Sequence, residues 1–269
     1  MIQLSAAQVS HYFTEGYLTL PPLTTPEEVA SLRAIYDHHF EIRSGRETGD
    51  QFDLFGNDQN PDKPNVPQIL GLSRFAPEVK QTQLYAAVKS VVAQLLGVEM
   101  ELGDHAIRKP PFCTLATPWH QDEAYWDARH DHCSLSVWVP LQDVDVTSGC
   151  MHFVPRSHYG EILPHRSAGN DPSVHGLELD GDFSELLKRA VACPLAAGSC
   201  TIHHNRTLHY ATANQKAEPR RAWIFGGGLS LKRQAPWKKP WEEAKNTLRS
   251  QRAREHAAKL AAERQVVAV

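Results

Sequence analysis

The chain has 269 residues, of which 41% are hydrophobic and 22% charged, so it is long enough to bury a sizeable core. Its 28 basic and 31 acidic residues are mixed along the sequence and leave a formal net charge of −3, which argues against nucleic acid or an anionic membrane as a partner. We find no basic leader followed by an apolar run and no stretch long enough to span a bilayer. We therefore expect a cytoplasmic protein that acts on a small molecule.

The sequence divides into three stretches that we expect to form one domain over residues 1–269, because β-rich domains of this size are common. They are a mostly helical scaffold with a loop over 1–97, a β-barrel core over 98–230, and a C-terminal helical tail over 231–269. The five cysteines are an odd number without a CxxC pair, which argues against a disulfide framework or a structural zinc site.

Capping signals predict three helices in the first stretch. Ser5 forms a capping-box pattern with Gln8, and Thr25 begins a second N-cap pattern. A third amphipathic helix is predicted from about Pro77, with Gly97 as its stop signal. Between the last two helices, residues 46–74 are rich in Pro, Asn, Asp and Gly and predict a long loop that borders the active site.

From about residue 98, short apolar runs bounded by Pro, Gly and Asp predict a β-sandwich or barrel. Residues 134–139 alternate between small polar and large apolar side chains, and similar runs occupy 150–154, 200–204 and 222–229. Neither a GxGxxG nor a GxxxxGK[ST] loop opens a helix, which disfavours a nucleotide-binding α/β fold. The tail over 241–265 is rich in Ala, Glu, Lys and Arg and predicts a solvated surface helix whose charges serve solubility.

A first pair of candidate metal ligands is His120 and Asp122, which point to the same side if the segment is extended. Such a pair alone is common in loops without any function. Here, however, Trp119, Tyr125 and Trp126 surround it with aromatic side chains, which suits a partly dry pocket.

A third ligand must come from residues 202–209, where His203, His204 and His209 compete. Turn-forming residues follow His209, and an apolar strand then begins at Arg220. A hairpin would place Arg220 beside His209, with its guanidinium close to the metal and Arg221 on the opposite side of the strand. Two His and one carboxylate form the facial triad of non-haem Fe(II) oxygenases, which leaves positions open for oxygen and a co-substrate.

Together, these motifs resemble the phytanoyl-CoA dioxygenase family of Fe(II)/2-oxoglutarate-dependent oxygenases. The resemblance covers about residues 98–230 and rests on five features of the sequence: the triplet 120–122, Trp138, the segment 148–158, His209 with Asn214, and Arg220 eleven positions after His209. It implies a mainly β fold with helical additions, in which N-terminal helices and a C-terminal helix flank a double-stranded β-helix (jelly-roll, cupin-like) core.

The resemblance also implies roles for individual residues. His120, Asp122 and His209 would bind Fe(II), and Arg220 would pair with the far carboxylate of 2-oxoglutarate. Trp138 and Gln121 would line the co-substrate pocket. Many members of the family have a Ser two residues after the distal His, where this chain has Ala211; Thr201 and Thr212 are the candidates to supply that hydroxyl.

The implied reaction uses O2 to decarboxylate 2-oxoglutarate to succinate and CO2, and it oxidises an unactivated C–H bond of a second substrate. Related halogenases have a small residue in place of the carboxylate ligand. The presence of Asp122 therefore favours hydroxylation, or a related oxidation, over halogenation.

Candidates for contacts with that second substrate surround the predicted site: Trp126, Tyr125, Lys109, Arg108, His105 and His204. An inward-pointing Lys109 or Arg108 would favour a substrate with a carboxylate or phosphonate. Otherwise, a neutral secondary-metabolite scaffold such as a terpenoid or alkaloid fits better.

Two other classes of function remain open on the sequence. One is a cupin-like metalloenzyme that uses the same ligands without 2-oxoglutarate, and Arg220 argues against it. The other is a non-catalytic binding barrel in which the histidines are structural.

Overall fold

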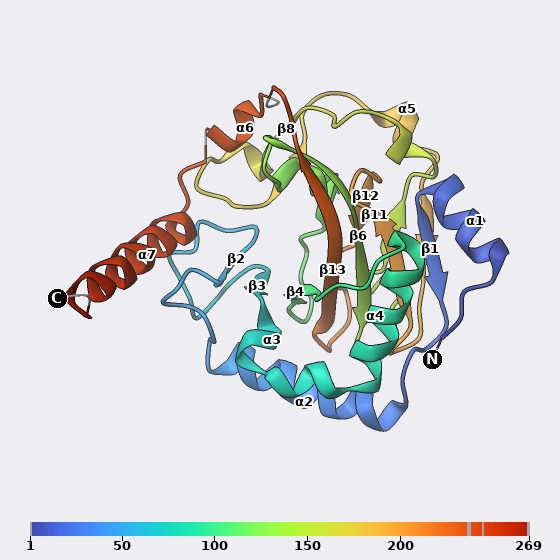
Figure 1. The fold of residues 1–269 in the computed structure, drawn as a ribbon, viewed down its shortest axis with the longest axis horizontal. Coiled ribbons are helices and arrows are strands. Elements are labelled where there is room, and N and C mark those ends of the chain that lie inside the picture. Colours follow the sequence, from blue (N-terminus) through green and yellow to red (C-terminus); the bar gives the residue numbers. More distant parts are fainter. Residues whose placement is uncertain (1, 236–237, 244, 268–269) are drawn as a thin grey trace.

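The computed structural model describes residues 2–235, 238–243 and 245–267 and contains two large antiparallel sheets (Figure 1). The seven-stranded sheet has the order β1 (Tyr17–Leu20), β11 (Cys200–His204), β6 (His130–Pro140), β13 (Arg220–Lys232), β4 (Gly103–Lys109), β3 (Pro67–Leu70) and β2 (Gln51–Asp53). The four-stranded sheet has the order β10 (Val191–Cys193), β7 (Met151–Phe153), β12 (His209–Ala211) and β5 (Thr117–His120). A separate pair joins β8 (His165–Ser167) to β9 (Leu177–Leu179).

The seven-stranded (large) sheet and the four-stranded (small) sheet pack face to face around a shared apolar core. Trp138 on β6 and Ile224 on β13 are register partners in the large sheet, and they belong to one buried cluster with Met151 and Phe153 of the small sheet. Interdigitation of two inner faces is the usual way in which β-sandwiches bury apolar area. The predicted mainly β class, a jelly roll with helical additions, is confirmed.

Helices cover the outer face of the large sheet (Figure 1). They are α1 (Ala6–Glu15), α2 (Pro26–Glu41) and α4 (Gln83–Leu96), and a second buried cluster joins them to the sheet. The predicted N-caps are confirmed, because the side chain of Ser5 accepts a hydrogen bond from Gln8 N and that of Thr25 from Glu28 N.

The third helix begins later than predicted. Residues Pro77–Gln81 form a short 3-10 helix, and Thr82 then adopts extended backbone angles. Its hydroxyl accepts a hydrogen bond from Tyr85 N, so it is the N-cap of a new helix, α4. Gly97 ends α4 in the left-handed conformation, as its predicted stop signal requires.

The prediction of a continuous loop over residues 46–74 was wrong. The segment contains the strands β2 and β3 and the short helix α3 (Leu72–Phe75), and the two strands extend one edge of the large sheet. Strands of three and four residues carry too few alternating positions to stand out among prolines. The carboxylate of Asp53 closes the turn between them by accepting hydrogen bonds from Asn65 N at 2.7 Å and Val66 N at 2.9 Å.

The predicted hairpin between His209 and Arg220 was also wrong. His209 begins β12, which pairs with β5 and β7 in the small sheet, whereas Arg220 begins β13, which pairs with β4 and β6 in the large sheet. The intervening turn therefore crosses from one sheet to the other. Arg221 does face away from the core, where its Nε lies 2.7 Å from Asp37 Oδ1 on α2.

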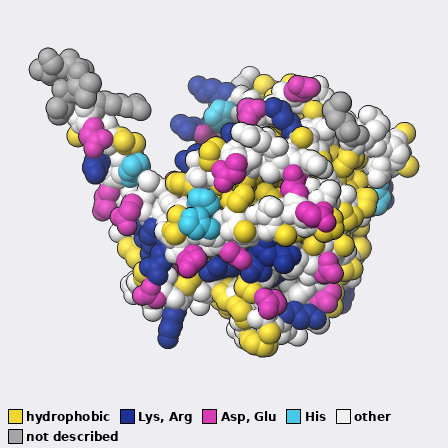
Figure 2. Space-filling view, turned by 90° about the horizontal axis from the view of Figure 1, so that it is seen from below, with side chains coloured by type: hydrophobic (Ala, Val, Ile, Leu, Met, Phe, Trp, Pro, Cys, Tyr) yellow, Lys and Arg dark blue, Asp and Glu magenta, His cyan; other side chains and the backbone are white. Residues whose placement is uncertain are grey.

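The remaining elements are short helices and the C-terminal helix. They are η2 (Asp122–Tyr125), η3 (Ser157–Tyr159), η4 (Ala168–Asn170), α5 (Ser184–Leu187), α6 (Pro240–Glu243) and α7 (Leu248–Val267). The far end of α7 projects from the body of the protein (Figures 1 and 2), as a solvated helix would.

The near part of the tail differs from the prediction of a purely solvated helix. Lys239 is buried and donates hydrogen bonds to backbone carbonyl groups of Glu123 and Trp126. Trp241 Nε1 donates to Ala124 O at 3.0 Å, and Arg252 pairs with Asp58. The Ala- and Lys-rich composition of the tail does not reveal these contacts, because they join it to segments far away in the sequence.

The visible surface in one view carries charges of both signs. On the face in Figure 2, basic and acidic side chains are intermixed. Within the described ranges, no helix has the length and apolar character needed to cross a membrane.

Candidate metal centre and its cavities

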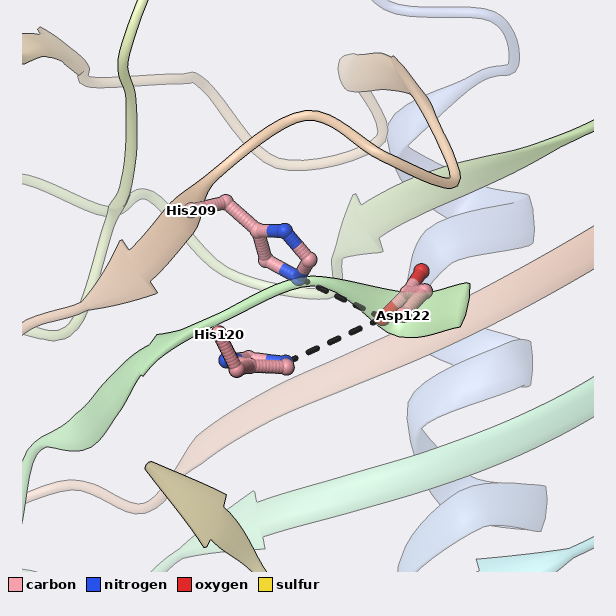
Figure 3. A group of neighbouring side chains, drawn as sticks. All are labelled: His120, Asp122 and His209. Atoms are coloured by element: carbon pink, nitrogen blue, oxygen red, sulfur yellow. Dashed lines mark ion pairs between the residues drawn. The ribbon is translucent and has the colours of Figure 1, made fainter. Parts of the chain in front are cut away.

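Three side chains converge at one end of the barrel: His120 at the end of β5, Asp122 at the start of η2, and His209 at the start of β12 (Figure 3). Asp122 Oδ1 lies 3.7 Å from His120 Nε2 and 3.4 Å from His209 Nε2. His120 and His209 are register partners across β5 and β12, so the sheet itself fixes the pair. Separations of this size suit ligand atoms that share one ion, since metal–ligand bonds are roughly 2 Å long.

Backbone carbonyl groups orient both imidazoles. His120 Nδ1 lies 2.7 Å from Pro118 O, and His209 Nδ1 lies 2.8 Å from Thr207 O. A carbonyl oxygen only accepts, so each Nδ1 carries the proton and each Nε2 presents its lone pair to the centre. Burial, followed by the nearby His209, lowers the pKa of His120 to about 3, which keeps that ring neutral at neutral pH.

The second oxygen of Asp122 is held by two residues of the large sheet. Ser136 Oγ donates to Asp122 Oδ2 at 2.7 Å, and His203 Nε2 lies 3.2 Å from the same oxygen. Burial by itself would raise the pKa of this carboxyl, but His209 and the hydrogen bond from His203 bring it well below its usual range. The carboxylate is therefore ionised and turned so that Oδ1 faces the two histidines.

A buried ion pair holds the backbone next to Asp122. Glu123 is 1% exposed and pairs with Arg206, whose Nε lies 2.7 Å from Glu123 Oε2. Asn205 donates to the same carboxylate oxygen, and Lys239 Nζ donates to the Glu123 carbonyl. The contacts from Arg206 and Asn205 connect η2 to the segment after β11 and restrict movement of the Asp122 ligand, while Lys239 attaches the C-terminal tail to the same segment.

A small cavity of about 60 Å³ leads from the three candidate ligands to Arg220. Arg220 is 2% exposed; its Nη1 donates to Ile107 O at 3.3 Å, and its Cζ lies 5.5 Å from the centre of the Trp138 ring. Among the described residues no carboxylate pairs with it, and its Nε has no hydrogen-bond partner. Burial lowers the pKa of Arg220 to about 10, so the guanidinium stays charged and is suited to a carboxylate from a ligand.

Lys109 is a second buried cation beside this cavity. Its Nζ donates to Ala211 O at 3.0 Å and Thr212 O at 2.6 Å, and burial, followed by the charge of Arg220, lowers its pKa well below the usual value.

The hydroxyl oxygens of Thr201 and Thr212 are both buried without a hydrogen-bond partner. Both hydroxyls therefore remain candidates to replace the Ser hydroxyl that many family members have at the position of Ala211.

A larger cavity of about 620 Å³ adjoins the candidate metal ligands His120 and Asp122. Tyr125, Trp126 and His105, three of the predicted substrate residues, line it together with His120 and Asp122. His105 also lines the small cavity, so the two spaces meet beside the metal centre. A volume of this size is typical of pockets for small molecules.

Three other predicted site residues lie elsewhere. The side-chain amide of Gln121 lines neither cavity. Its Nε2 donates to Glu161 O and Arg206 O, and its Oε1 accepts from Leu163 N. The guanidinium of Arg108 lies 4.9 Å from the centre of the Phe40 ring, on the helix-covered face of the sheet. His204 accepts a hydrogen bond from Arg206 N at 3.1 Å, and burial lowers its pKa to about 4.

Sequence reasoning missed several residues that surround the centre. Ser136 holds Asp122 together with His203, which the sequence offered only as a rival for the third ligand, while His175, Glu242 and Arg249 line the larger cavity. The only signal in the sequence was the alternation in β6, which puts Ser134, Ser136 and Trp138 on one face of the strand. Nothing in the sequence alone relates the tail to the cavity.

Comparison with known proteins agrees with this geometry. Residues 12–222 match the phytanoyl-CoA dioxygenase family. The chain is 27% identical over 146 residues to a probable alpha-ketoglutarate-dependent hypophosphite dioxygenase of Stutzerimonas stutzeri, covering 52% of this chain and 49% of that protein. It is 27% identical over 149 residues to a probable phytanoyl-CoA dioxygenase of Caenorhabditis elegans, covering 51% of this chain and 46% of that protein. The chain thus spans about half the length of these curated relatives.

A similar solved structure is EvdO2 from Micromonospora carbonacea var. aurantiaca. It is 34% identical, with a TM-score of 0.77, and the match covers 89% of this chain and 97% of that one. EvdO2 complexed with 2-oxoglutarate is similar at 32% identity and a TM-score of 0.76. Since the family match spans most of the sequence, this chain belongs to the phytanoyl-CoA dioxygenase family.

Proposed function

We propose that the protein is an Fe(II)- and 2-oxoglutarate-dependent oxygenase that hydroxylates a C–H bond of a small molecule. One observation carries the proposal: a His–Asp–His cluster and a buried arginine without a carboxylate partner among the described residues share one small cavity. The cluster is the ligand set of non-haem Fe(II) oxygenases, and the arginine supplies the charge that a dicarboxylate co-substrate requires.

The residues of the chain have separate tasks in this proposal. His120, Asp122 and His209 would hold Fe(II), which, when bound together with 2-oxoglutarate and O2, supplies the oxidising chemistry. Arg220 would fix the far carboxylate of 2-oxoglutarate, with the Trp138 ring against its guanidinium.

The surroundings of the metal ligands would keep this arrangement ordered. Ser136 and His203 hold one oxygen of Asp122, which leaves the other oxygen for the metal. The apolar residues around the small cavity, Ile107, Met151 and Ile224, limit its access to water, and this strengthens the pairing of Arg220 with a carboxylate.

The larger cavity would hold the substrate next to the metal. It shares His120 and Asp122 with the small cavity, so a bound molecule would lie beside the candidate ligands, while Arg220 lines only the small cavity. The carboxylate of Asp122 supports hydroxylation over halogenation, because it occupies the position that a halide ligand would need.

The test is formation of succinate from 2-oxoglutarate by the purified protein with Fe(II) and O2, screened over a panel of small molecules. We expect succinate to depend on Fe(II), to be stimulated by a subset of the panel, and to disappear in His209→Ala. Iron binding without any consumption of 2-oxoglutarate would contradict the proposal and favour a cupin-like metalloenzyme that does not use 2-oxoglutarate.

A further inference from the structure

The wall of the larger cavity includes residues that do not belong to the barrel. Leu54 and Phe55 come from the segment after β2, while Glu242 and Arg249 come from α6 and α7. These residues and the candidate metal ligands His120 and Asp122 line the same space. A substrate bound near the metal therefore also reaches the C-terminal segment.

Two other cations of this segment, Lys245 and Arg252, already have carboxylate partners. Lys245 Nζ lies 2.6 Å from Glu242 Oε1 and 4.7 Å from the centre of the Tyr125 ring. Arg252 pairs with Asp58, and it also donates to a backbone carbonyl of β2 at 3.3 Å. These pairs fasten the start of α7 to the body of the protein.

Arg249 differs from its neighbours. Its Cζ lies 5.1 Å from the centre of the buried Phe52 ring, which fixes the direction of the side chain. Its Nε is buried without a hydrogen-bond partner, and no carboxylate of the described ranges lies within ion-pair distance of it. The pKa of Arg249 is lowered, first by burial, so the cation has lost part of its water.

The two carboxylates that act most on the charge of Arg249 form ion pairs with other cations. The carboxylate of Glu242 is paired with Lys245, and that of Asp50 is paired with Arg74 at 2.9 Å. The charge of Arg249 on the cavity wall is therefore left for a ligand. A guanidinium that is held in place and partly desolvated binds a carboxylate more strongly than it binds a neutral amide.

The aromatic and aliphatic part of the wall favours an apolar body for that ligand. Phe55, Trp126, Leu135 and Tyr125 line the cavity, and the centre of the Tyr125 ring lies 6.0 Å from that of His120. Apolar and aromatic walls with a few placed polar groups are typical of pockets that orient one molecule.

We propose that Arg249 on α7 determines substrate specificity by receiving a carboxylate of the substrate, so that the substrate is a carboxylic acid with an apolar or aromatic body. The proposal rests on the proposed function, because it assumes that the larger cavity receives the molecule to be oxidised. It replaces the sequence-based candidates for an anion contact: Arg108 lies on the other face of the sheet and Lys109 beside the small cavity.

The test is equilibrium binding of matched acids and amides to the full-length protein. The probes are phenylacetate, 3-phenylpropionate, 4-phenylbutyrate and 5-phenylvalerate, each with its primary amide, titrated calorimetrically under argon with Fe(II) and saturating 2-oxoglutarate, so that Arg220 is occupied. We expect at least one acid to bind about tenfold more tightly than its amide.

Three variants assign this preference to one residue. Arg249→Gln is expected to bring acid and amide to within about twofold, and Arg249→Lys to keep part of the preference. Arg254→Gln removes the same charge from an exposed position of α7 and is expected to behave like the wild type. Melting temperatures of all variants check that each one is folded.

The inference is overturned if no acid is preferred over its amide, or if Arg249→Gln keeps the preference while 2-oxoglutarate still binds. If the preference for the acid depends on Arg249 but the protein does not bind 2-oxoglutarate, the proposed function is contradicted, while the carboxylate site at Arg249 is still supported. The two failures are therefore distinguishable in the same set of titrations.

Discussion

The two cavities beside the metal centre are built in different ways. The small cavity is lined by residues of strands β4, β5, β6, β7, β11, β12 and β13, whose positions are fixed by the ladders of the two sheets. The larger cavity shares part of this framework, but its outer wall comes from the segment after β2, from His175 and from the C-terminal segment. In the proposed function, rigid strands would thus hold the groups for the common chemistry, while added segments would form the part that recognises a particular substrate.

This difference predicts that substitutions in the two regions have different consequences. Changes in the strand-built region should abolish metal or co-substrate binding whatever the substrate is. Changes in the added segments should alter stability or substrate choice and leave the metal centre intact.

The largest effect is expected at a candidate metal ligand. His209→Ala removes one of three donors, so Fe(II) affinity should fall by more than the roughly 100-fold that loss of an outer hydrogen-bond partner costs. His204→Ala is the matched control, because this histidine lies five positions earlier and outside both cavities. Calorimetric titration of Fe(II) under argon measures both variants, and equal affinities would remove His209 from the ligand set.

The next largest effect is expected on the affinity for 2-oxoglutarate. Arg220→Gln should weaken 2-oxoglutarate binding by about 2–5 kcal/mol, the usual cost of removing one partner of a buried charge pair, while Fe(II) affinity is retained. Arg221→Gln is the control, since this neighbour pairs with Asp37 on the opposite side of the strand. Titration of 2-oxoglutarate into the Fe(II)-loaded protein gives the two constants, and an unchanged constant for Arg220→Gln would refute its assignment.

A smaller effect is expected from the residues that hold Asp122. Ser136→Ala removes a 2.7 Å hydrogen bond to Asp122 Oδ2 and should lower Fe(II) affinity about 10–100-fold. Ser134→Ala, two positions earlier on the same face of β6, removes a hydroxyl that does not bind Asp122 and should change little. If both variants bind Fe(II) equally well, the contact from Ser136 does not orient the ligand.

The smallest effect on the metal centre should come from the tail. Lys239→Met leaves the carbonyl groups of Glu123 and Trp126 without their donor, which should lower the free energy of unfolding by about 1–3 kcal/mol. Lys238→Met changes an exposed neighbour and should be close to neutral. Denaturant unfolding of both variants measures the difference, and loss of Fe(II) binding in folded Lys239→Met would contradict the separation of the two regions.

The same division explains what the sequence could predict. His120 and Asp122 are close together in the chain, so they could be paired directly. The spacing to Arg220 favoured His209 among three histidines, even though the segment between His209 and Arg220 crosses from one sheet to the other instead of forming a hairpin. The positions of Arg249 and Lys239 could not be predicted, because they depend on packing of the tail against segments more than 100 residues away. Charge and helix propensity carry no information about such contacts.

Anaerobic addition of Fe(II) and 2-oxoglutarate to the wild-type protein and to Arg220→Gln tests the central claim most directly. We predict a weak visible charge-transfer band at about 500 nm in the wild type, and in Arg220→Gln the same band only at much higher 2-oxoglutarate concentration. Absence of the band in the folded, Fe(II)-bound wild-type protein at saturating 2-oxoglutarate would contradict the account.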